Sequence, residues 1–377
     1  MRLLPLLILV GSLLLSACSD DEDFYAPDPL VEIDNQFKSR VIWSTSIGSG
    51  QSDLSVKIPP VYAYGKIYVV DAFGKVMAID PKNGRKIWSK DFELPIAGGP
   101  AVGNKILAFG TSQGELHVLN AENGEFLWKA QVSSEIISSP AVGDGYVVVR
   151  TSDGKIFAFD GISGEQKWFY DESLPSLTLR GNSSPVIFGG GVMAGFSNGK
   201  LAVFILENGQ LAWEKRIATA IGGSEIQRLV DIDLQPLVVG SSIYIGSFNG
   251  NLASLNYRNG EFNWQRELST YRDLAVGELL LFATHENSYV SAINRSNGVI
   301  IWTQKDLHRR QLTAPAVVGE FLVVADFEGY LHWISPKTGK IVSRKSIDSS
   351  GFSARPLVIE DTLILYSKDG SLYAIEK

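Results

Sequence analysis

Short apolar runs alternate with glycine-containing turns along nearly the whole chain. In one stretch the runs are Ile106–Gly110, Leu116–Asn120 and Phe126–Ala130, separated by turns that end at Gly114 and Gly124. A shorter apolar pair precedes them. Runs of this length predict strands, and turn residues paired with glycine mark hairpins, because the turn needs a positive φ. The pattern predicts an antiparallel unit of four strands with no helix.

The unit repeats about every 40 residues with fixed spacing. A glycine is followed 14 residues later by a tryptophan at Gly74–Trp88, Gly114–Trp128, Gly154–Trp168, Gly199–Trp213 and Gly250–Trp264; Ser288–Trp302 and Gly329–Ser343 keep the spacing with one residue replaced. A proline lies 14 residues before this position in seven copies: Pro60, Pro100, Pro140, Pro185, Pro236, Pro315 and Pro356, with Leu274 in the remaining copy. Four strands per 40-residue repeat are typical of a β-propeller blade.

The eighth copy is split between the two ends of the chain. It begins at Gly370, and the sequence stops at Lys377, before a fourth strand. The missing strand is present near the N-terminus as Arg40–Trp43. The sequence therefore predicts an all-β fold, an eight-bladed propeller over residues 38–377 with four antiparallel strands per blade. The N-terminal strand should join the C-terminal blade, which removes an open sheet edge.

Two recurring residue types have structural interpretations within this repeat. The tryptophan that ends each fourth strand is expected to pack between neighbouring blades. An Asp or Asn lies four residues before the second turn's glycine, at Asp80, Asn120, Asp160, Asn256 and Asn294. Such a short side chain can hydrogen-bond the turn backbone. We interpret these residues as parts of turns and not as a carboxylate site.

The N-terminal residues precede the repeat and have the pattern of a lipoprotein signal. Residues 1–17 contain Arg2 followed by an apolar stretch, Leu3–Leu15, that is short for a membrane-spanning helix. The stretch ends in Leu-Ser-Ala-Cys at Cys18, which resembles the bacterial lipobox, where the cysteine is acylated. The resemblance implies lipid attachment at Cys18 and, with Ser19 next, an outer-membrane location on the periplasmic face. An ordinary signal peptide with a nearby cysteine is the alternative.

Composition narrows the possible partners. The chain has 377 residues, a formal net charge of −7 and one cysteine, so neither nucleic acid binding nor an internal disulfide is expected. Residues 18–37 start with a run of acids at 20–23 and contain Pro27 and Pro29. This segment is predicted to be a lipidated acidic tether that holds the propeller off the membrane.

The repeat also resembles a known family. Its segments Ala78–Trp88, Ala158–Trp168 and Ala292–Trp302 closely follow the pattern Ala-x-Asp-x-x-Asn-Gly-x-x-x-Trp of quinoprotein-type propellers. Together with the lipobox and eight blades, the chain resembles the BamB family of outer-membrane β-barrel assembly. The resemblance implies a non-enzymatic scaffold that binds BamA, aids the folding and insertion of outer-membrane proteins, and contacts nascent barrels as a further option.

Two connections between blades are longer than the rest. The interval from Trp to the next Pro is 12 residues after Trp88, but 17 after Trp168 and 23 after Trp213. All these connections emerge on one face, and long loops on a rigid scaffold often carry function. The two long loops flank the same blade and are expected to form one surface near the central channel.

These loops contain the candidate partner-binding residues. Leu177, Leu179 and Arg180 lie in the first, and leucines beside an arginine in a loop are typical of protein-binding anchors. Asp231 and Asp233 lie in the second. The resemblance implies that the Leu-x-Leu-Arg and Asp-x-Asp segments contact BamA. The alternative is internal: the leucines plug the channel and Arg180 pairs with an aspartate.

Two other classes of protein remain as alternatives. A periplasmic quinoprotein-type dehydrogenase shares this fold, but such enzymes commonly have adjacent cysteines and a calcium site, and two aspartates supply too few oxygens for calcium. The four histidines have no metal-ligand spacing: His117, His285, His308 and His332. We therefore expect no cofactor, no metal and no catalysis. A carbohydrate- or peptidoglycan-binding propeller is the second alternative, which exposed loop aromatics would favour.

Overall fold

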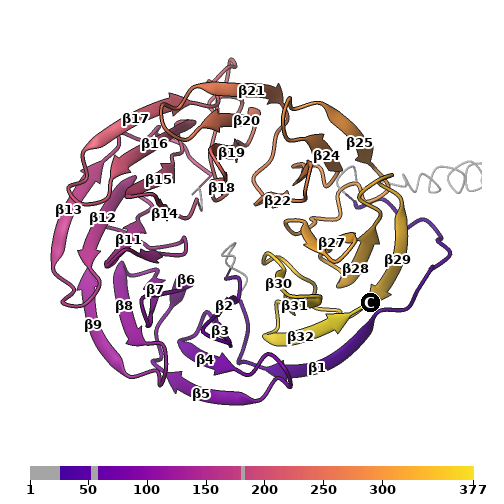
Figure 1. Cartoon of the computed structure of the whole chain (residues 1–377), viewed down its shortest axis with the longest axis horizontal. Coiled ribbons are helices and arrows are strands. Elements are labelled where there is room, and N and C mark those ends of the chain that lie inside the picture. The colour runs from indigo at the N-terminus through magenta and orange to yellow at the C-terminus, as the bar shows by residue number, and fades with distance from the viewer. Residues whose placement is uncertain (1–25, 52–57, 180–182) are drawn as a thin grey trace, which may run out of the picture.

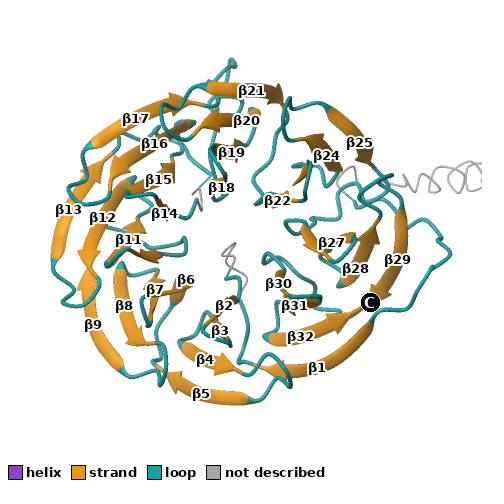
Figure 2. Cartoon of the chain, viewed as in Figure 1, coloured by secondary structure: helices purple, strands orange, loops and turns teal. Residues whose placement is uncertain are grey.

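The computed structural model describes residues 26–51, 58–179 and 183–377. Within these ranges the chain forms 32 strands and no helix (Figure 2). Residues 1–25, which include the predicted signal and Cys18, lie outside the described residues, as does Arg180.

The strands are grouped in sheets of four, which we number as blades 1 to 8 along the chain. Blades 1 to 4 contain β2 (Val61–Ala63), β3 (Lys66–Val70), β4 (Lys75–Ile79), β5 (Lys86–Asp91); β6 (Ile96–Gly103), β7 (Ile106–Thr111), β8 (Glu115–Asn120), β9 (Phe126–Gln131); β10 (Ala141–Gly143), β11 (Tyr146–Arg150), β12 (Lys155–Asp160), β13 (Gln166–Asp171); and β14 (Val186–Phe188), β15 (Gly191–Gly195), β16 (Lys200–Ile205), β17 (Leu211–Arg216). Blades 5 to 8 contain β18 (Leu237–Val239), β19 (Ser242–Gly246), β20 (Asn251–Asn256), β21 (Phe262–Glu267); β22 (Ala275–Val276), β23 (Leu280–Thr284), β24 (Val290–Asn294), β25 (Ile300–Gln304); β26 (Ala316–Val318), β27 (Phe321–Ala325), β28 (Tyr330–Ile334), β29 (Ile341–Ser346); and β30 (Leu357–Ile359), β31 (Thr362–Tyr366), β32 (Ser371–Glu376) with β1 (Arg40–Ser46).

The eight sheets stand around a central channel, each with its first strand innermost (Figure 1). Neighbouring strands within every blade are antiparallel, as in the order β10-β11-β12-β13 of blade 3. The predicted eight-bladed propeller is therefore confirmed.

The apolar core lies between the blades. The middle strands are buried along most of their length, whereas the outermost strand β13 alternates between buried and exposed positions. One cluster joins Ala158 and Trp168 of blade 3 to Val192 and Phe204 of blade 4. Because a single sheet leaves its apolar faces exposed, each blade is stabilised by its neighbours, and the ring folds as a unit.

The repeated tryptophans join each blade to the next. The indole Nε1 of each donates a hydrogen bond of 2.7–3.2 Å to a backbone carbonyl in the second turn of the following blade, in the pairs Trp43–Pro81, Trp88–Ala121, Trp128–Gly161, Trp168–Leu206, Trp213–Tyr257, Trp264–Arg295 and Trp302–Pro336. The ring lies against that turn's glycine, so that a Cβ added to Gly164 would be 2.7 Å from Trp128. This contact explains the fixed spacing of glycine and tryptophan.

We predict that Gly164→Ala destabilises the ring more than Gly145→Ala in the same blade. Both glycines have a positive φ, of 73° and 83°, but a Cβ at Gly145 would meet nothing within 4 Å. A β-carbon at positive φ costs about 1–2 kcal/mol, and displacing a packed side chain adds about 1–3 kcal/mol. Thermal unfolding of both variants checks this, and equal melting temperatures would contradict it.

The ring closes between the two ends of the chain. Strand β1 pairs with β32 from Arg40–Glu376 to Ser46–Ser371, with a bulge between Val41 and Trp43. The predicted closure by the N-terminal strand is confirmed (Figure 1).

The closure also explains why blade 7 has Ser343 where other blades have the docking tryptophan. No turn joins β32 to β1, because they come from opposite ends of the chain, so the usual docking turn does not exist here. Phe37 instead packs between Phe321 and Trp333, with ring centroids 5.0 and 5.4 Å away.

Candidate functional site

The first long loop connects β13 to β14 and carries the two predicted leucines. Leu177 and Leu179 are 41% and 40% exposed, so both present apolar surface to solvent. Arg180, the third predicted residue of this loop, lies outside the described residues.

The second long loop connects β17 to β18 and projects further. Its residues 219–228 are all exposed, including Ile221 at 77% and Ile226 at 73%. The side-chain oxygen of Gln227 accepts a hydrogen bond from the Gly223 amide at 3.0 Å, and the Ser224 carbonyl accepts one from the Arg228 amide at 3.2 Å. These local bonds shape the tip, which leaves both isoleucines available for contact.

The base of this loop is fixed to the turn between β19 and β20. The Asn249 side-chain amide donates to the carbonyls of Gln227 and Leu229, at 2.9 and 3.2 Å. The Phe248 amide donates to the Asp231 carbonyl at 2.8 Å. The tip is therefore carried on a backbone held by blade 5.

Asp231 brings the two loops together. Its side chain is 1% exposed, and its Oδ2 accepts a hydrogen bond from the Leu179 amide at 3.1 Å. The structure therefore places two of the predicted residues, far apart in sequence, in direct contact. Asp231 acts from below the surface, where it holds the backbone that presents Leu179.

A buried arginine completes the base of the site, and sequence reasoning missed it. Arg150 ends β11, is 3% exposed, and donates from Nη2 to Ser197 Oγ at 3.3 Å. Burial lowers the pKa of Arg150, and the nearby carboxylates of Asp231 and Asp233 oppose this by stabilising its charge. The cation balances two acids that would be costly to bury alone.

A sequence signal for Arg150 did exist. It lies four residues before the first-turn glycine of its blade, and the other seven blades have uncharged residues there: Val70, Gly110, Gly195, Gly246, Thr284, Ala325 and Tyr366. A lone charge at an otherwise uncharged repeat position marks a blade with a special role.

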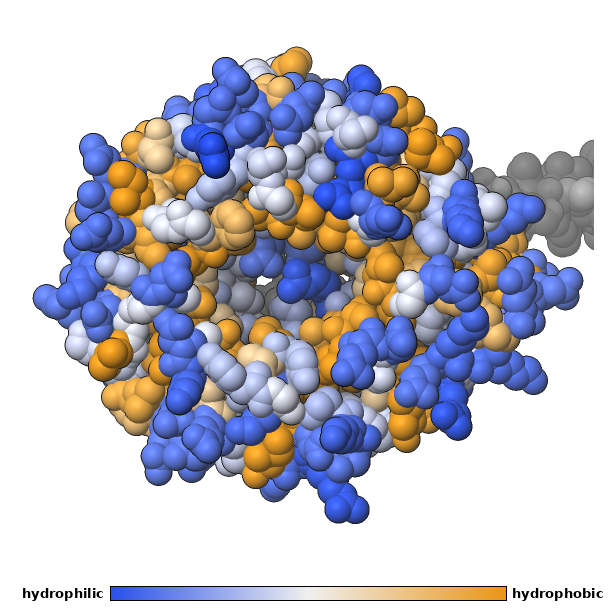
Figure 3. Space-filling model, viewed as in Figure 1, coloured by the Kyte–Doolittle hydropathy of each residue, from blue (hydrophilic) through white to orange (hydrophobic). Residues whose placement is uncertain are grey.

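The central channel adjoins this site and is polar (Figure 3). Asp233 lines a cavity of about 60 Å³, together with Tyr271, Arg272 and Asp273. Arg355 crosses from blade 8 and reaches Asp273 at 3.2 Å and Gln235 at 3.3 Å. Neither Leu177 nor Leu179 is among the described residues that line this cavity.

Two searches of the described residues were negative. No group of three or more His, Cys, Asp or Glu side chains in that part of the chain could hold a metal ion. None of its segments forms a helix of the length and hydropathy needed to cross a membrane.

Comparison with known proteins gives a consistent result. The family model described as "Outer membrane protein assembly factor BamB" matches residues 72–304 and 286–377. The protein of that name from Escherichia coli K12 is 37% identical over 393 residues, covering 100% of both chains. The one from Kangiella koreensis is 43% identical over 375 residues, covering 100% of this chain and 96% of that protein.

Solved structures agree on the fold. BamB from Moraxella catarrhalis superposes with a TM-score of 0.82 at 26% identity, covering 90% of this chain and 100% of that one. A quinohemoprotein alcohol dehydrogenase from Comamonas testosteroni has a TM-score of 0.70 at 13% identity, covering 89% of this chain and 76% of that one, and shares the fold alone. On the full-length sequence matches, the chain belongs to the BamB family of outer membrane protein assembly factors.

Proposed function

We propose that this chain is a non-catalytic scaffold lipoprotein of outer-membrane β-barrel assembly that binds the periplasmic region of BamA through its two long loops. Its role is to aid the folding and insertion of outer-membrane proteins. The named relatives are assembly factors, which supports the general role.

One observation carries the binding site: two insertions on a rigid ring meet through the Leu179–Asp231 hydrogen bond and present apolar side chains. Leu177, Leu179, Ile221 and Ile226 are each at least 40% exposed there. Apolar side chains in a pre-organised loop are suited to bury against a partner, since little ordering entropy is lost on binding.

The charged residues of the site divide into two roles. Asp231 and Asp233 position the loops from inside, with Arg150 balancing their charge. Arg180 either binds a partner carboxylate or pairs with one of these aspartates. A double-mutant cycle on loop stability between Arg180 and each aspartate separates the two roles, because coupling is expected only if they pair.

The direct test is a binding measurement between the purified chain and the periplasmic region of BamA. A saturable complex that competes with labelling of the loop face supports the proposal. Failure to bind at micromolar concentrations, with the ring folded, would contradict it.

We predict that Cys18→Ala releases the protein from the outer membrane. The proposal places the acyl chains on this cysteine, and each buried CH₂ contributes about 0.8 kcal/mol to membrane binding. Fractionation of cell envelopes checks the prediction, with Ser19→Ala as the matched control that should stay anchored. A Cys18→Ala protein that remains in the membrane fraction would locate the anchor elsewhere.

A further inference from the structure

The segment before β1 does not hang free but lies along the rim of blade 7. Figure 1 shows it as the indigo strand of chain outside β29. The Gln36 amide donates to the Val342 carbonyl at 2.9 Å, and the Asp28 amide donates to the His308 carbonyl at 3.2 Å. Leu30 packs on the apolar cluster shared by blades 6 and 7. We call residues 28–39 the strap.

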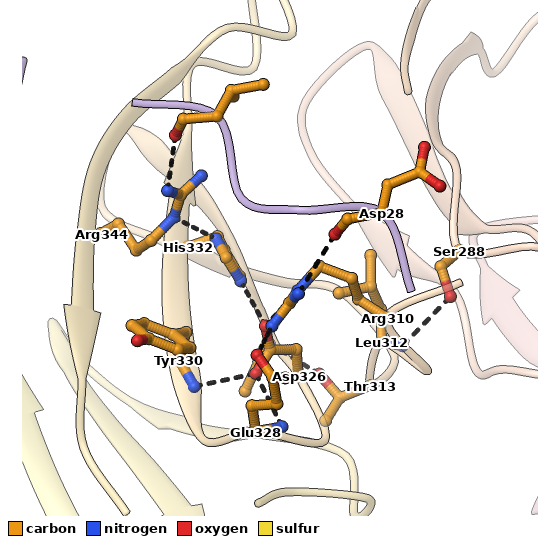
Figure 4. A network of polar contacts seen from close by, with 12 residues as sticks. Asp28, Ser288, Arg310, Leu312, Thr313, Asp326, Glu328, Tyr330, His332 and Arg344 are labelled. Atoms are coloured by element: carbon orange, nitrogen blue, oxygen red, sulfur yellow. Dashed lines mark hydrogen bonds and ion pairs between the residues drawn. The ribbon is translucent and has the colours of Figure 1, made fainter. Parts of the chain in front are cut away.

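Two arginines of the propeller hold the strap backbone (Figure 4). Arg344 Nη1 donates to the Val31 carbonyl at 2.8 Å, and the Arg344 amide donates to Asn35 Oδ1 at 2.7 Å. Arg310 Nη1 donates to the Asp28 carbonyl at 3.4 Å. The strap is thus bound at its two ends and at its centre.

The arginines are themselves fixed by a buried network. Arg310 Nε and His332 Nε2 both contact Asp326 Oδ2, at 2.7 and 3.0 Å, and Arg310 also pairs with Glu328. Asp326 and His332 are fully buried. Arg344 Nε donates to His332 Nδ1 at 3.1 Å, so that Nδ1 must accept and the imidazole proton must lie on Nε2, facing the carboxylate.

We propose that the strap fixes where the anchored N-terminus leaves the disc, so that the rim of blades 6 and 7 faces the lipid surface. This inference rests on the proposed lipid attachment at Cys18. From Cys18 to Asp28 the chain has ten residues, which span at most about 35 Å when extended. Without docking, the 22 residues from Cys18 to Arg40 would span about 75 Å. Docking therefore halves the reach of the tether and selects one rim.

The rim so selected has surface suited to a nearby bilayer. Ile300 and Ile301 on β25 are 43% and 53% exposed, and Val31 of the strap is 45% exposed. Apolar side chains at the edge of a lipid-tethered disc can enter the interfacial region without disturbing the ring, because they project from an outermost strand.

Strap docking is predicted to weaken in acid. The groups facing His332 are Asp326, Arg310, Arg344 and Tyr330, with Glu328 paired to Arg310. Burial holds the pKa of His332 below its ordinary 6.5, only partly offset by Asp326. The unfolded chain therefore binds the proton first, and stability falls as the pH drops below about 6.5. The Asp326 pKa is lowered from 3.8, so its contribution is lost only at lower pH.

Amide hydrogen exchange measures this pH effect. Protection of the Asp28 and Gln36 amides, corrected for intrinsic rates, should decrease between pH 7.5 and 5, while the amides of β12 stay protected. Protection that is equal at the two pH values would show that His332 does not control the strap.

Energy transfer to labelled lipids tests the orientation. Cys18 is the only cysteine, and lipidation consumes its thiol, so one added cysteine gives a single labelling site. Lys305→Cys lies next to β25 in blade 6, and Lys129→Cys lies on β9 in the opposite blade 2. With the full-length lipidated protein in phosphatidylethanolamine and phosphatidylglycerol vesicles, transfer to headgroup acceptors should be several-fold higher from position 305.

Two strap variants complete the experiment. Arg344→Ala frees the Val31 carbonyl, and the milder Asn35→Ala removes one acceptor at the strap surface; each should reduce the difference between the two sites at least twofold. Equal transfer from both sites in the anchored parent overturns the proposal and leaves the lipid anchor intact. If Cys18→Ala stays vesicle-bound, the anchor assignment fails and the strap proposal fails with it.

Discussion

Replacing Leu177, Leu179 and Arg180 together by alanine is expected to weaken binding to the periplasmic region of BamA by at least about a hundredfold. Buried apolar anchors at the centre of an interface contribute about 2 kcal/mol or more each, which is about thirtyfold in affinity. The combined loss is set below the product because neighbouring side chains are not additive. Titration of the purified variant against BamA's periplasmic region gives the affinity.

Thermal unfolding of the same variant separates binding from folding. The loop lies outside the blade repeat, and both leucines are about 40% exposed, so the melting temperature should change little. Ile162→Ala is the matched control, because Ile162 is 91% exposed in a turn of blade 3 on the opposite face and should leave binding unchanged. Normal affinity of the triple variant would remove this face from the proposal. A triple variant that cannot fold would show that the side chains act inside the channel.

The repeat made most of the fold predictable from sequence. The glycine and tryptophan spacing is readable because each tryptophan docks on a glycine turn of the next blade, as Trp128 does on Gly164. One contact repeated around a ring places the same residues at the same interval in each copy. The split eighth copy was equally readable, since a propeller blade needs its fourth strand and only Arg40–Trp43 could supply it.

The parts that escaped prediction depend on contacts between segments with no shared period. The Leu179 amide bonds to Asp231, 52 residues away, and no pattern in either loop encodes that pair. Arg150 was hidden because a strand position was assumed to be apolar, although its charge departs from every other blade.

The strap shows the same limit in a different form. Residues 18–37 are acidic and contain prolines, which indicated a solvated tether. Their described part is instead docked on blade 7, because Arg344 and Arg310 donate to backbone carbonyls that every residue has. Composition does not report such contacts, so the docking could only be found in three dimensions.

The largest loss of stability is expected from deleting β1 while keeping the signal and the tether. The deletion removes the complete pairing with β32 and the Trp43 indole that lies on Gly84 and donates to the Pro81 carbonyl. Truncating one buried tryptophan costs about 3–5 kcal/mol, and the lost strand adds the apolar contacts that Val41 makes with blades 7 and 8. The melting temperature should fall by roughly 10 °C or more.

A comparison of three proteins tests whether closure itself is responsible. Trp43→Ala keeps the strand pairing and should lose only part of the stability lost by the deletion. The deletion also exposes the β32 edge, which can pair with other chains, so light scattering should detect aggregation that Trp43→Ala does not show. A synthetic peptide with the sequence of Arg40–Ser46 should restore part of the lost stability, because the vacant edge accepts the same strand in trans. A deletion protein that melts like its parent would mean that the ring is held by the seven other interfaces alone.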